Sequence, residues 1–279
     1  MAIRIITDTT CDIPYEEREK LGIDILPLTV YFGEEGFRDR IDITSEQFYE
    51  RLKTVDKLPT TSQIYPSEFE KIFAEYAACG DSIICIHISS ELSGTMQSAA
   101  IAREKFPDAE IYVIDSQYVA YALGILVLEA VKLRDSGLAA AEIVERVEKL
   151  RERVRIYAVV DDIKYFKMGG RLSGAGAALV NILNIKPIVH MKGGKIHVFP
   201  KERGMKNAFN AIAKTALEDN IDFDMPFIMG AASMNERIDA LKRAFGSSLE
   251  RQPDYEVSLS PVVGTHTGPG CTGIAFFVK

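Results

Sequence analysis

The stretch SIICIHISSELSGT, residues 82–95, holds the signals that decide the fold of this chain. Its first half, Ser82–Ile88, is a strongly apolar run that predicts a buried strand. Hydroxyl side chains follow, and a helix is predicted from Gly94 to Phe106. A buried strand that passes through a short loop into a helix is the repeating unit of parallel sheets with helices on both faces. The stretch therefore favours an α/β fold.

The same alternation of strands and helices extends over residues 1–154. Short apolar runs predict strands at Ala2–Thr7, within Ile23–Phe32 and at Glu110–Ile114. Apolar periodicity and start signals predict further helices from Pro14 to about Gly22, from an N-cap at Ser45 to about Thr54, from Pro66 through Cys79, over Tyr118–Arg134 and over Ala139–Arg153. We interpret this half of the chain as a domain built on a parallel sheet.

Residues 155–279 show a different pattern. Strands are predicted at Arg155–Val160 and Thr272–Val278, a Gly-rich loop at Gly169–Gly174 and a hairpin turn at Gly193-Gly194. Helices are predicted near Met205–Asp219 and Asn235–Phe245. This mixture indicates a second domain of the α+β class, with a boundary near residue 154.

The composition excludes several classes of protein. The net charge of −7 and the isoelectric point of about 5.3 argue against a general nucleic-acid binder, which usually carries a basic face. None of the four cysteines is spaced as C-x-x-C, which indicates reduced, mostly buried thiols. The longest apolar run, Tyr118–Leu128, is too short for a membrane span, and no apolar signal segment precedes the first predicted strand. We therefore expect a cytoplasmic protein without an integral membrane segment.

Three loops rich in hydroxyl groups and glycine carry the candidate chemistry. They are Thr60–Gln63, Ser89–Thr95 and Gly264–Gly270. The first two precede predicted helices, whose unpaired N–H groups and positive dipole end favour an anion. In the third, we interpret His266 as a hydrogen-bond donor in a loop. Each loop taken alone is more often an ordinary capped loop or a turn.

Other kinds of site find little support. The letters Gly268-x-Gly270-x-x-Gly273 match a dinucleotide fingerprint, yet the residues that follow predict a strand where a helix is required. The histidines lack the spacing of a metal site, and a carboxylate at a strand end, such as Asp8, is more often a cap. G-x-S-x-G is absent, so a hydrolase or transferase that uses Ser93 and His266 stays an alternative supported by residue types alone. We expect no metal and no cofactor.

Taken together, these segments resemble the DegV family of bacterial fatty-acid-binding proteins over nearly the whole chain. The matching segments, each weak alone but specific in order and spacing, are Ile6–Asp12, Thr61–Gln63, Ile88–Ala99, Val113–Ser116, Gly169–Ser173, Asn184–Pro187 and Gly264–Gly270. Ile64 and Tyr65 depart from the Pro and Ser frequent in the family, and Ala120–Gly124 replaces the usual S-x-G-x-G. These departures leave the head-group loops intact and affect the shape of the pocket.

The resemblance implies a two-domain α/β protein. A Rossmann-like N-terminal domain would cover residues 1–154 and a mixed α+β domain residues 155–279, with the option that residues 24–45 pack on the second domain. A long-chain fatty acid would lie in a buried pocket. The protein would present the fatty acid carboxylate to a separate ATP-dependent fatty acid kinase subunit, which forms the acyl-phosphate. The protein itself would then have no catalytic machinery.

Carried over position by position, the resemblance also implies residue roles. The carboxylate would be held by Thr61, Ser62, Ser93, Gly94, Thr95, Thr265 and His266. Arg171 and Arg203 would face the kinase subunit, and Ser93 would be a hydrogen-bond donor, not a nucleophile. A further alternative is a regulatory protein that senses lipid without feeding a kinase. It would be favoured if the surface with Arg171 and Arg203 proved unnecessary for acyl-phosphate formation.

Overall fold

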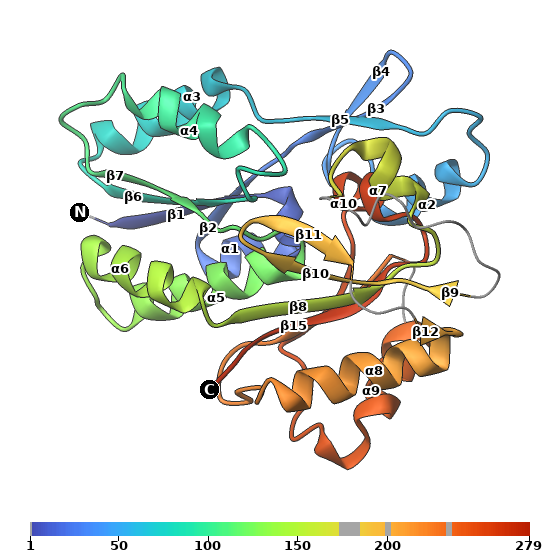
Figure 1. Ribbon diagram of the computed structural model, residues 1–279. Helices are drawn as coiled ribbons and strands as arrows, with labels where there is room; N and C mark the ends of the chain where they lie inside the picture. The colour runs from blue at the N-terminus through green and yellow to red at the C-terminus, as the bar shows by residue number, and fades with distance from the viewer. Residues whose placement is uncertain (1, 173–184, 199–201, 233–235) are drawn as a thin grey trace.

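The first layer of the molecule is a four-stranded parallel sheet (Figure 1). The structure is a computed structural model that describes residues 2–172, 185–198, 202–232 and 236–279. The sheet has the order β2-β1-β6-β7 and consists of β1 (Ile3–Asp8), β2 (Ile23–Leu26), β6 (Ser82–His87) and β7 (Ile111–Asp115). Every residue of β6 is buried, as its continuous apolar run predicts for a strand covered on both faces. The predicted α/β fold with a parallel sheet is confirmed.

Helices cover both faces of this sheet. α3 (Pro66–Ala78) and α4 (Thr95–Arg103) lie on one face, and α5 (Tyr121–Asp135) and α6 (Ala140–Arg151) lie on the other (Figure 1). Pro66 occupies the first turn of α3, where a missing N–H leaves no hydrogen bond unmade. At the end of β1, Asp8 accepts from the Thr10 amide and caps the short 3-10 helix η1 (Thr9–Cys11). The capping role predicted for a strand-end carboxylate is therefore confirmed at Asp8.

A six-stranded mixed sheet forms the second layer. It has the order β11-β10-β8-β15-β13-β14, with β8 (Val154–Val159), β10 (Ile188–Lys192), β11 (Lys195–Val198), β13 (Ile228–Ala231), β14 (Tyr255–Ser258) and β15 (Thr272–Phe277). α8 (Met205–Glu218) and α9 (Glu236–Phe245) pack on one face. Along β8, Tyr157 and Val159 join the cluster under these helices, whereas Ile156 and Ala158 face the larger core on the other side.

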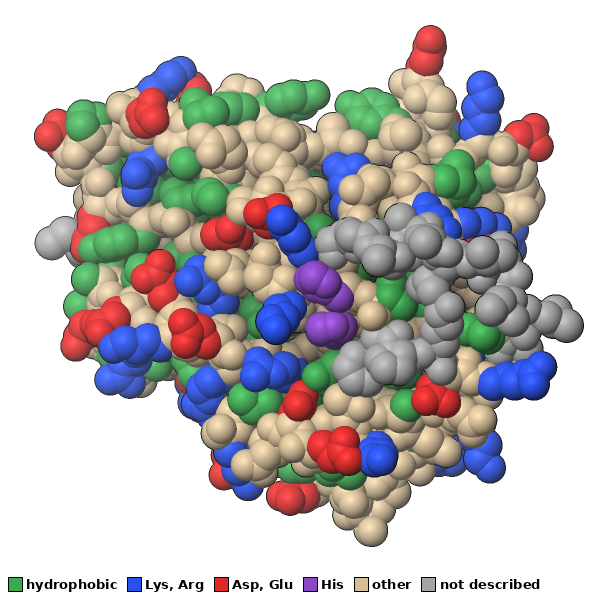
Figure 2. Space-filling view, in the orientation of Figure 1, with side chains coloured by type: hydrophobic (Ala, Val, Ile, Leu, Met, Phe, Trp, Pro, Cys, Tyr) green, Lys and Arg blue, Asp and Glu red, His purple; other side chains and the backbone are tan. Residues whose placement is uncertain are grey.

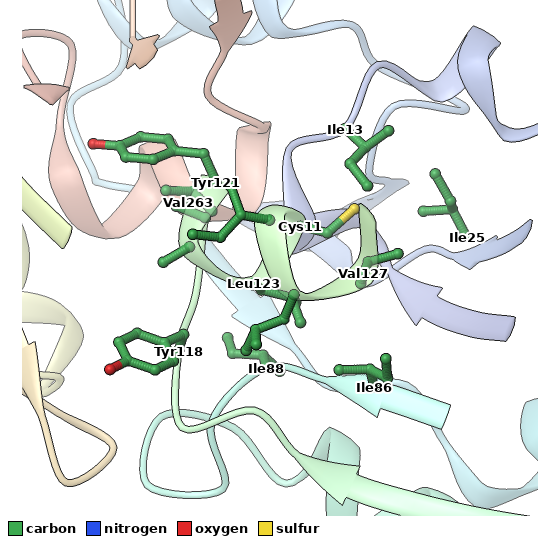
Figure 3. Close-up of a cluster of buried hydrophobic side chains, with 14 of the residues drawn as sticks. Cys11, Ile13, Ile25, Ile86, Ile88, Tyr118, Tyr121, Leu123, Val127 and Val263 are labelled. Carbon is green, nitrogen blue, oxygen red and sulfur yellow. The ribbon is translucent and has the colours of Figure 1, made fainter. Parts of the chain in front are cut away.

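α5 lies between the two sheets and contacts both (Figure 1). Figure 3 shows Leu123 and Val127 of α5 among side chains of the first layer, including Cys11 and Ile86, whereas Tyr121 lies beside Val263. The Tyr121 ring packs against Gly230 of the second sheet. A Cβ on Gly124 would come within 2.5 Å of the Cys11 carbonyl oxygen, so only glycine allows this close approach of the helix. The predicted domain boundary near residue 154 coincides with the start of β8. It stays a prediction, because α5 from the first half packs on the second sheet.

A small antiparallel sheet with the order β4-β3-β5 lies at one end of the molecule (Figure 1). Its strands and the helices beside it are β3 (Thr29–Phe32), β4 (Glu35–Arg38), β5 (Thr60–Ser62), α2 (Ser45–Leu52) and α10 (Pro261–Thr267). β3, β5 and α2 all contact α10, which comes from the end of the chain. The predicted extended segment Ile23–Phe32 is therefore two strands in different sheets, separated at Pro27-Leu28. Proline has no N–H for a strand ladder, which accounts for the break.

Other predicted boundaries are wrong. The N-cap of α2 is Thr44 instead of Ser45, because Thr44 and Gln47 form a reciprocal capping box. The segment Gly264–Gly270 is not a loop, since its first half continues α10 from Pro261. Asn235, Ser173, Gly174 and Asn184 lie outside the described residues.

The remaining elements are η2 (Tyr15–Glu17), α1 (Arg18–Leu21), α7 (Lys164–Gly169), β9 (Ile185–Lys186), β12 (Glu202–Arg203), which pairs with β9, and η4 (Gly246–Ser248). Across the described ranges, we find no helix both long and apolar enough to cross a bilayer.

The backbone is strained at Ala120, the residue before α5. Its φ of 59° and ψ of −152° lie in a region that is almost restricted to glycine and costs about 1–3 kcal/mol. Glycine at this position would relieve that strain. Its greater backbone entropy in the unfolded state would lower stability by about 0.5–1 kcal/mol and so offset part of the gain. We expect Ala120→Gly to raise the free energy of unfolding by about 1 kcal/mol in urea titrations. Ala122→Gly, within the helix, should lower it by about 1 kcal/mol. Equal losses in both variants would contradict the assignment.

Candidate functional site

A cavity of about 380 Å³ lies between the two sheets. This volume falls within the range of roughly 300–1,000 Å³ that is common for small-molecule sites. Most of the lining is apolar and comes from β8, β10 and β11 of the second sheet, from loops that follow strands of the first sheet, and from α5 and α10. These apolar residues include Leu28, Ile88, Leu92, Val119, Ala120, Tyr121, Ile156, Ala158, Phe166, Val189, Met191, Ile196, Leu259, Val262, Val263 and Cys271. The cavity therefore suits a ligand with a large apolar part.

One group of polar side chains in the lining comes from segments far apart in the sequence. Its members are Thr61, Ser62, Gln63, Ser93, Arg171 and His266, together with the backbone of Gly94. Thr61 Oγ1 lies 2.9 Å from His266 Nε2, a hydrogen bond between residues 205 positions apart. Gln63 Nε2 donates to Ser98 Oγ over 2.9 Å, and a Cβ on Gly94 would collide with the Gln63 amide. The predicted loops around Thr61 and Ser93 are thus neighbours, and α10 brings His266 to the first of them.

Ser93 lies at the start of α4. Its Oγ accepts from the Thr95 amide at 3.3 Å and lies 3.0 Å from Thr95 Oγ1, while Gly94 is the N-cap residue and has no side chain to cap the helix. The first amides of α4 are consequently near the polar part of the lining, where the helix dipole favours negative charge. His266 Nε2 is bonded to Thr61, and the structure has no Ser93–His266 hydrogen bond among its described residues. The pairing that a serine nucleophile needs is therefore not formed.

Two of the predicted head-group residues do not line the cavity. Thr95 is fully buried beside it, and Thr265 donates its hydroxyl to the Pro261 carbonyl at 2.9 Å, within α10. Successive residues of a helix point about 100° apart, which is why Thr265 turns away when His266 faces the cavity. A loop at this position, as predicted from the sequence, would not impose that difference.

Arg171 follows α7 and lines the cavity, whereas Arg203 is exposed on β12 and does not. The Arg171 guanidinium donates to the Leu92 carbonyl from Nε at 3.1 Å and to the Gly169 carbonyl from Nη1 at 2.6 Å. It is the single Lys, Arg, Asp or Glu in the described lining. The roles of both arginines in partner binding stay predictions. The position of Arg171 in the lining also puts it within reach of a ligand in the cavity.

The electrostatics of this polar group favour an anion. Burial, together with the positive charge of Arg171, lowers the pKa of His266 to about 4, so the imidazole is neutral at pH 7. A Cβ on Gly169 would collide with His266 Nδ1, so the glycine lets α7 approach the ring. Ser62 Oγ and His266 Nδ1 are buried and have no hydrogen-bond partner within the described part of the chain. Unpaired polar atoms at such depth indicate a site that a polar ligand group or water completes.

The position of α10 depends on buried groups from the first half of the chain. Ser260 caps the helix by accepting from the Val263 amide, and Asp12 accepts from the Ser260 amide at 2.9 Å. Arg40 donates to Asp12 at 3.2 Å and to the Ser258 carbonyl at 2.7 Å. The Asp12–Ser260 and Arg40–Ser258 contacts join residues 248 and 218 positions apart and fix the helix that carries His266.

The matching family model, described as "Uncharacterised protein, DegV family", covers residues 2–279. The chain belongs to the DegV family. Protein DegV of Bacillus subtilis strain 168 is 34% identical over 282 residues, which is 100% of both sequences.

Solved DegV family structures share this fold. A fatty-acid-binding member from Thermus thermophilus has a TM-score of 0.91 and 30% identity over 100% of both chains. A stearic-acid-binding protein from Eubacterium ventriosum has a TM-score of 0.87 and 29% identity, over 100% of this chain and 99% of that one. DegV of Bacillus subtilis, itself a fatty-acid-binding protein, has a TM-score of 0.86 and 32% identity over 100% of both chains. These relatives bind fatty acids.

Some lining residues of this DegV family chain were not predicted. Thr10, which donates to Asp8, and Gln63 line the cavity, as do the apolar residues of β8, β10 and β11. Gln63 belongs to a predicted loop and could have been included on that ground. The apolar residues carry no signal of their own in the sequence, because a strand residue that faces a cavity and one that faces a packed helix are equally apolar.

Proposed function

We propose that this DegV family protein binds a long-chain fatty acid, with the acyl chain along the apolar lining and the carboxylate at the polar group. The observation that carries the proposal is a cavity that is apolar over most of its lining and, among the lining residues that the structure describes, has a single Lys, Arg, Asp or Glu, Arg171, near hydroxyl groups. Each buried methylene contributes about 0.8 kcal/mol, so about fifteen give about 12 kcal/mol before the cost of association. The fatty acids bound by similar structures support the same ligand class.

In this proposal, the carboxylate is held by hydrogen bonds from neutral donors and by one cation. When Nε2 of the neutral His266 carries its proton, it donates to Thr61 Oγ1, and the Thr61 hydroxyl proton is left for the ligand. Arg171 supplies the opposite charge, with Nη2 unpaired among the described contacts. Ser62, Ser93 and the amides of α4 complete the shell.

We further propose that the protein presents this carboxylate to a separate ATP-dependent fatty acid kinase subunit, which forms the acyl-phosphate. Phosphoryl transfer to a carboxylate needs a positioned acceptor and cations that neutralise the donor phosphates. The head-group site supplies the first requirement, and the kinase subunit would supply the second together with ATP and its metal. On this proposal, the protein is a binding subunit with no catalysis and no cofactor of its own.

The test of the proposed function has two stages. Native mass spectrometry of the purified protein should reveal co-purified fatty acid, or saturable uptake of added fatty acid after delipidation. The loaded protein is then mixed with a fatty acid kinase catalytic subunit and ATP, and acyl-phosphate is trapped as the hydroxamate. Protein that neither carries nor takes up fatty acid refutes the proposal at the first stage. Protein that binds fatty acid but yields no acyl-phosphate refutes only the kinase role.

Thr61→Val is a direct probe of the head-group site. Valine keeps the shape of threonine but removes the hydroxyl, and one neutral hydrogen bond contributes about 1 kcal/mol. We expect fatty acid to bind about five- to tenfold more weakly, as measured by titration with a fluorescent fatty acid. Thr60→Val is the matched control, because Thr60 is the exposed neighbour on β5 and does not line the cavity. Equal affinities of the two variants would remove Thr61 from the site.

A further inference from the structure

The hairpin formed by β10 and β11 covers part of the cavity. Val189, Met191 and Ile196 are buried and line the cavity, as does the partly buried His190, which lies opposite His197 across the hairpin. The hairpin crosses in front of the space between the two sheets in Figure 1, and two histidine side chains are visible on this face of the molecule in Figure 2. β11 is an edge strand of the six-stranded sheet. The hairpin therefore forms one wall of the cavity at the edge of the six-stranded sheet.

Among the described residues, two polar contacts fasten the tip of the hairpin to the loop that follows β6. Ser89 Oγ, which is fully buried, donates to the Gly194 carbonyl over 2.8 Å. Lys195 Nζ lies 3.3 Å from Glu91 Oε2 in an exposed ion pair. At the base, β10 pairs with β8 from Ile188 to His190. Nearer the tip, Ile196 forms an isolated bridge to Leu172. A neutral hydrogen bond, a solvent-exposed ion pair and an isolated bridge are each weak, so the tip can separate from its neighbours while the pairing of β10 with β8 stays formed.

The chemistry of a fatty acid favours the hairpin as the way in. A ligand that entered through the polar group would draw its apolar tail past Arg171, Thr61 and His266. A ligand that entered beneath a raised hairpin would meet Val189, Met191 and Ile196 first. Contact with these three apolar side chains keeps the methylenes out of water as they enter.

We propose that the β10–β11 hairpin is the lid through which the acyl chain enters and leaves, and that the Ser89–Gly194 hydrogen bond is its latch. The inference rests on the proposed function for the identity of the ligand. It gives Ser89 a role different from that of its neighbours. Ser93 and Gly94 of the same loop line the head-group site, whereas Ser89 holds the cover. Closing the lid and forming the head-group site thus involve one loop.

A reversible disulfide tests the lid. A Cβ built on Gly194 lies 2.7 Å from Ser89 Oγ, so the pair Ser89→Cys and Gly194→Cys is within reach of a disulfide. We expect the oxidised double variant to exchange bound palmitate for isotope-labelled palmitate at least tenfold more slowly than its reduced form, with full recovery in dithiothreitol. The single variants, treated with the same oxidant, are the controls for the strain at Gly194, whose φ is +77°. Exchange at the same rate in both redox states would overturn the proposal.

Ser89→Ala provides a second test that needs no cross-link. Loss of the latch should speed palmitate exchange about fivefold, the factor expected for one neutral hydrogen bond. Ser90→Ala is the matched control, because Ser90 is exposed on the same loop and bonds to Asp115 instead of the hairpin. Equal exchange rates for the two variants would count against the latch. If the wild-type protein binds palmitate and no variant changes the rate, the lid is refuted and the proposed function stands. If the wild type binds none, both are refuted.

Discussion

Replacing Arg171 by methionine is expected to weaken fatty acid binding about 10- to 100-fold, since a hydrogen bond to a charged group contributes about 1.5–3 kcal/mol. Arg171 is the one Lys, Arg, Asp or Glu in the described lining, and its guanidinium is held in place by the Leu92 and Gly169 carbonyls. A carboxylate brought into the cavity without this cation would keep its charge in an apolar environment, which is costly. Dissociation constants from titration with a fluorescent fatty acid measure the effect.

A neutral ligand separates loss of the charge from damage to the fold. The fatty alcohol of the same chain length has no carboxylate, so its affinity should fall by much less than that of the fatty acid in Arg171→Met. Arg203→Met is the matched control, because Arg203 is exposed on β12 and does not line the cavity. Equal losses for the acid and the alcohol would show that Arg171 supports the loop structure and does not bind the head group.

Asp39→Asn is expected to stabilise the protein strongly at alkaline pH. Asp39 is fully buried, and in the described ranges its carboxylate oxygens make no hydrogen bond of good geometry, although Thr9 and the Val262 amide lie near enough to favour the ionised form. Burial raises the pKa of Asp39 to about 7, even though Arg40 opposes the shift. The folded state therefore binds this proton more tightly than the unfolded state, so the contribution to stability is full at low pH and is lost as pH rises toward 7. At pH 8 the buried charge costs about 4 kcal/mol.

Measurement at two pH values isolates this effect. The gain in unfolding free energy from Asp39→Asn should be about 3 kcal/mol larger at pH 8 than at pH 5, because at pH 5 most of the folded protein already carries the proton. Asp42→Asn is the control, since the exposed Asp42 has its pKa lowered to about 2 by Arg38 and is ionised at both pH values. Its effect on stability should not change between pH 5 and pH 8. An Asp39→Asn gain that is independent of pH would contradict the assignment.

The larger elements of the fold are predictable from the sequence, and the smaller ones less so. β6, α3 and α5 have long apolar patterns, so the regions Ser82–Ile88, Pro66–Cys79 and Tyr118–Arg134 were placed within a few residues. The extended segment Ile23–Phe32 was not recognised as strands of two sheets, because an apolar run does not say which neighbour it pairs with. α10 was missed for a related reason. Its seven residues include Gly264 and four β-branched side chains, a poor helical pattern that tertiary packing stabilises.

The candidate site, like the fold, was predictable from the sequence only in part. The loops around Thr61, Ser93 and His266 stand out by their hydroxyl groups and glycines, and the structure brings a residue of each to the cavity. Residue types could not show that the Thr265 hydroxyl bonds within its own helix or that Arg171 lines the cavity. Side-chain direction depends on the helical phase of α10 and on how α7 packs against it.

The sequence by itself determined the α/β class, the family and the chemical character of the Ser89–Thr95 loop, because these depend on local apolar patterns and on motifs in a fixed order. The tertiary structure alone decided how that loop is used. Ser93 and Gly94 face the cavity, Thr95 is buried beside it, and Ser89 bonds to the tip of a hairpin 105 residues away. The physical reason is that burial and hydrogen-bond partners arise from contacts between distant segments. Neighbouring hydroxyl groups of one loop therefore acquire different functions only when the chain is folded.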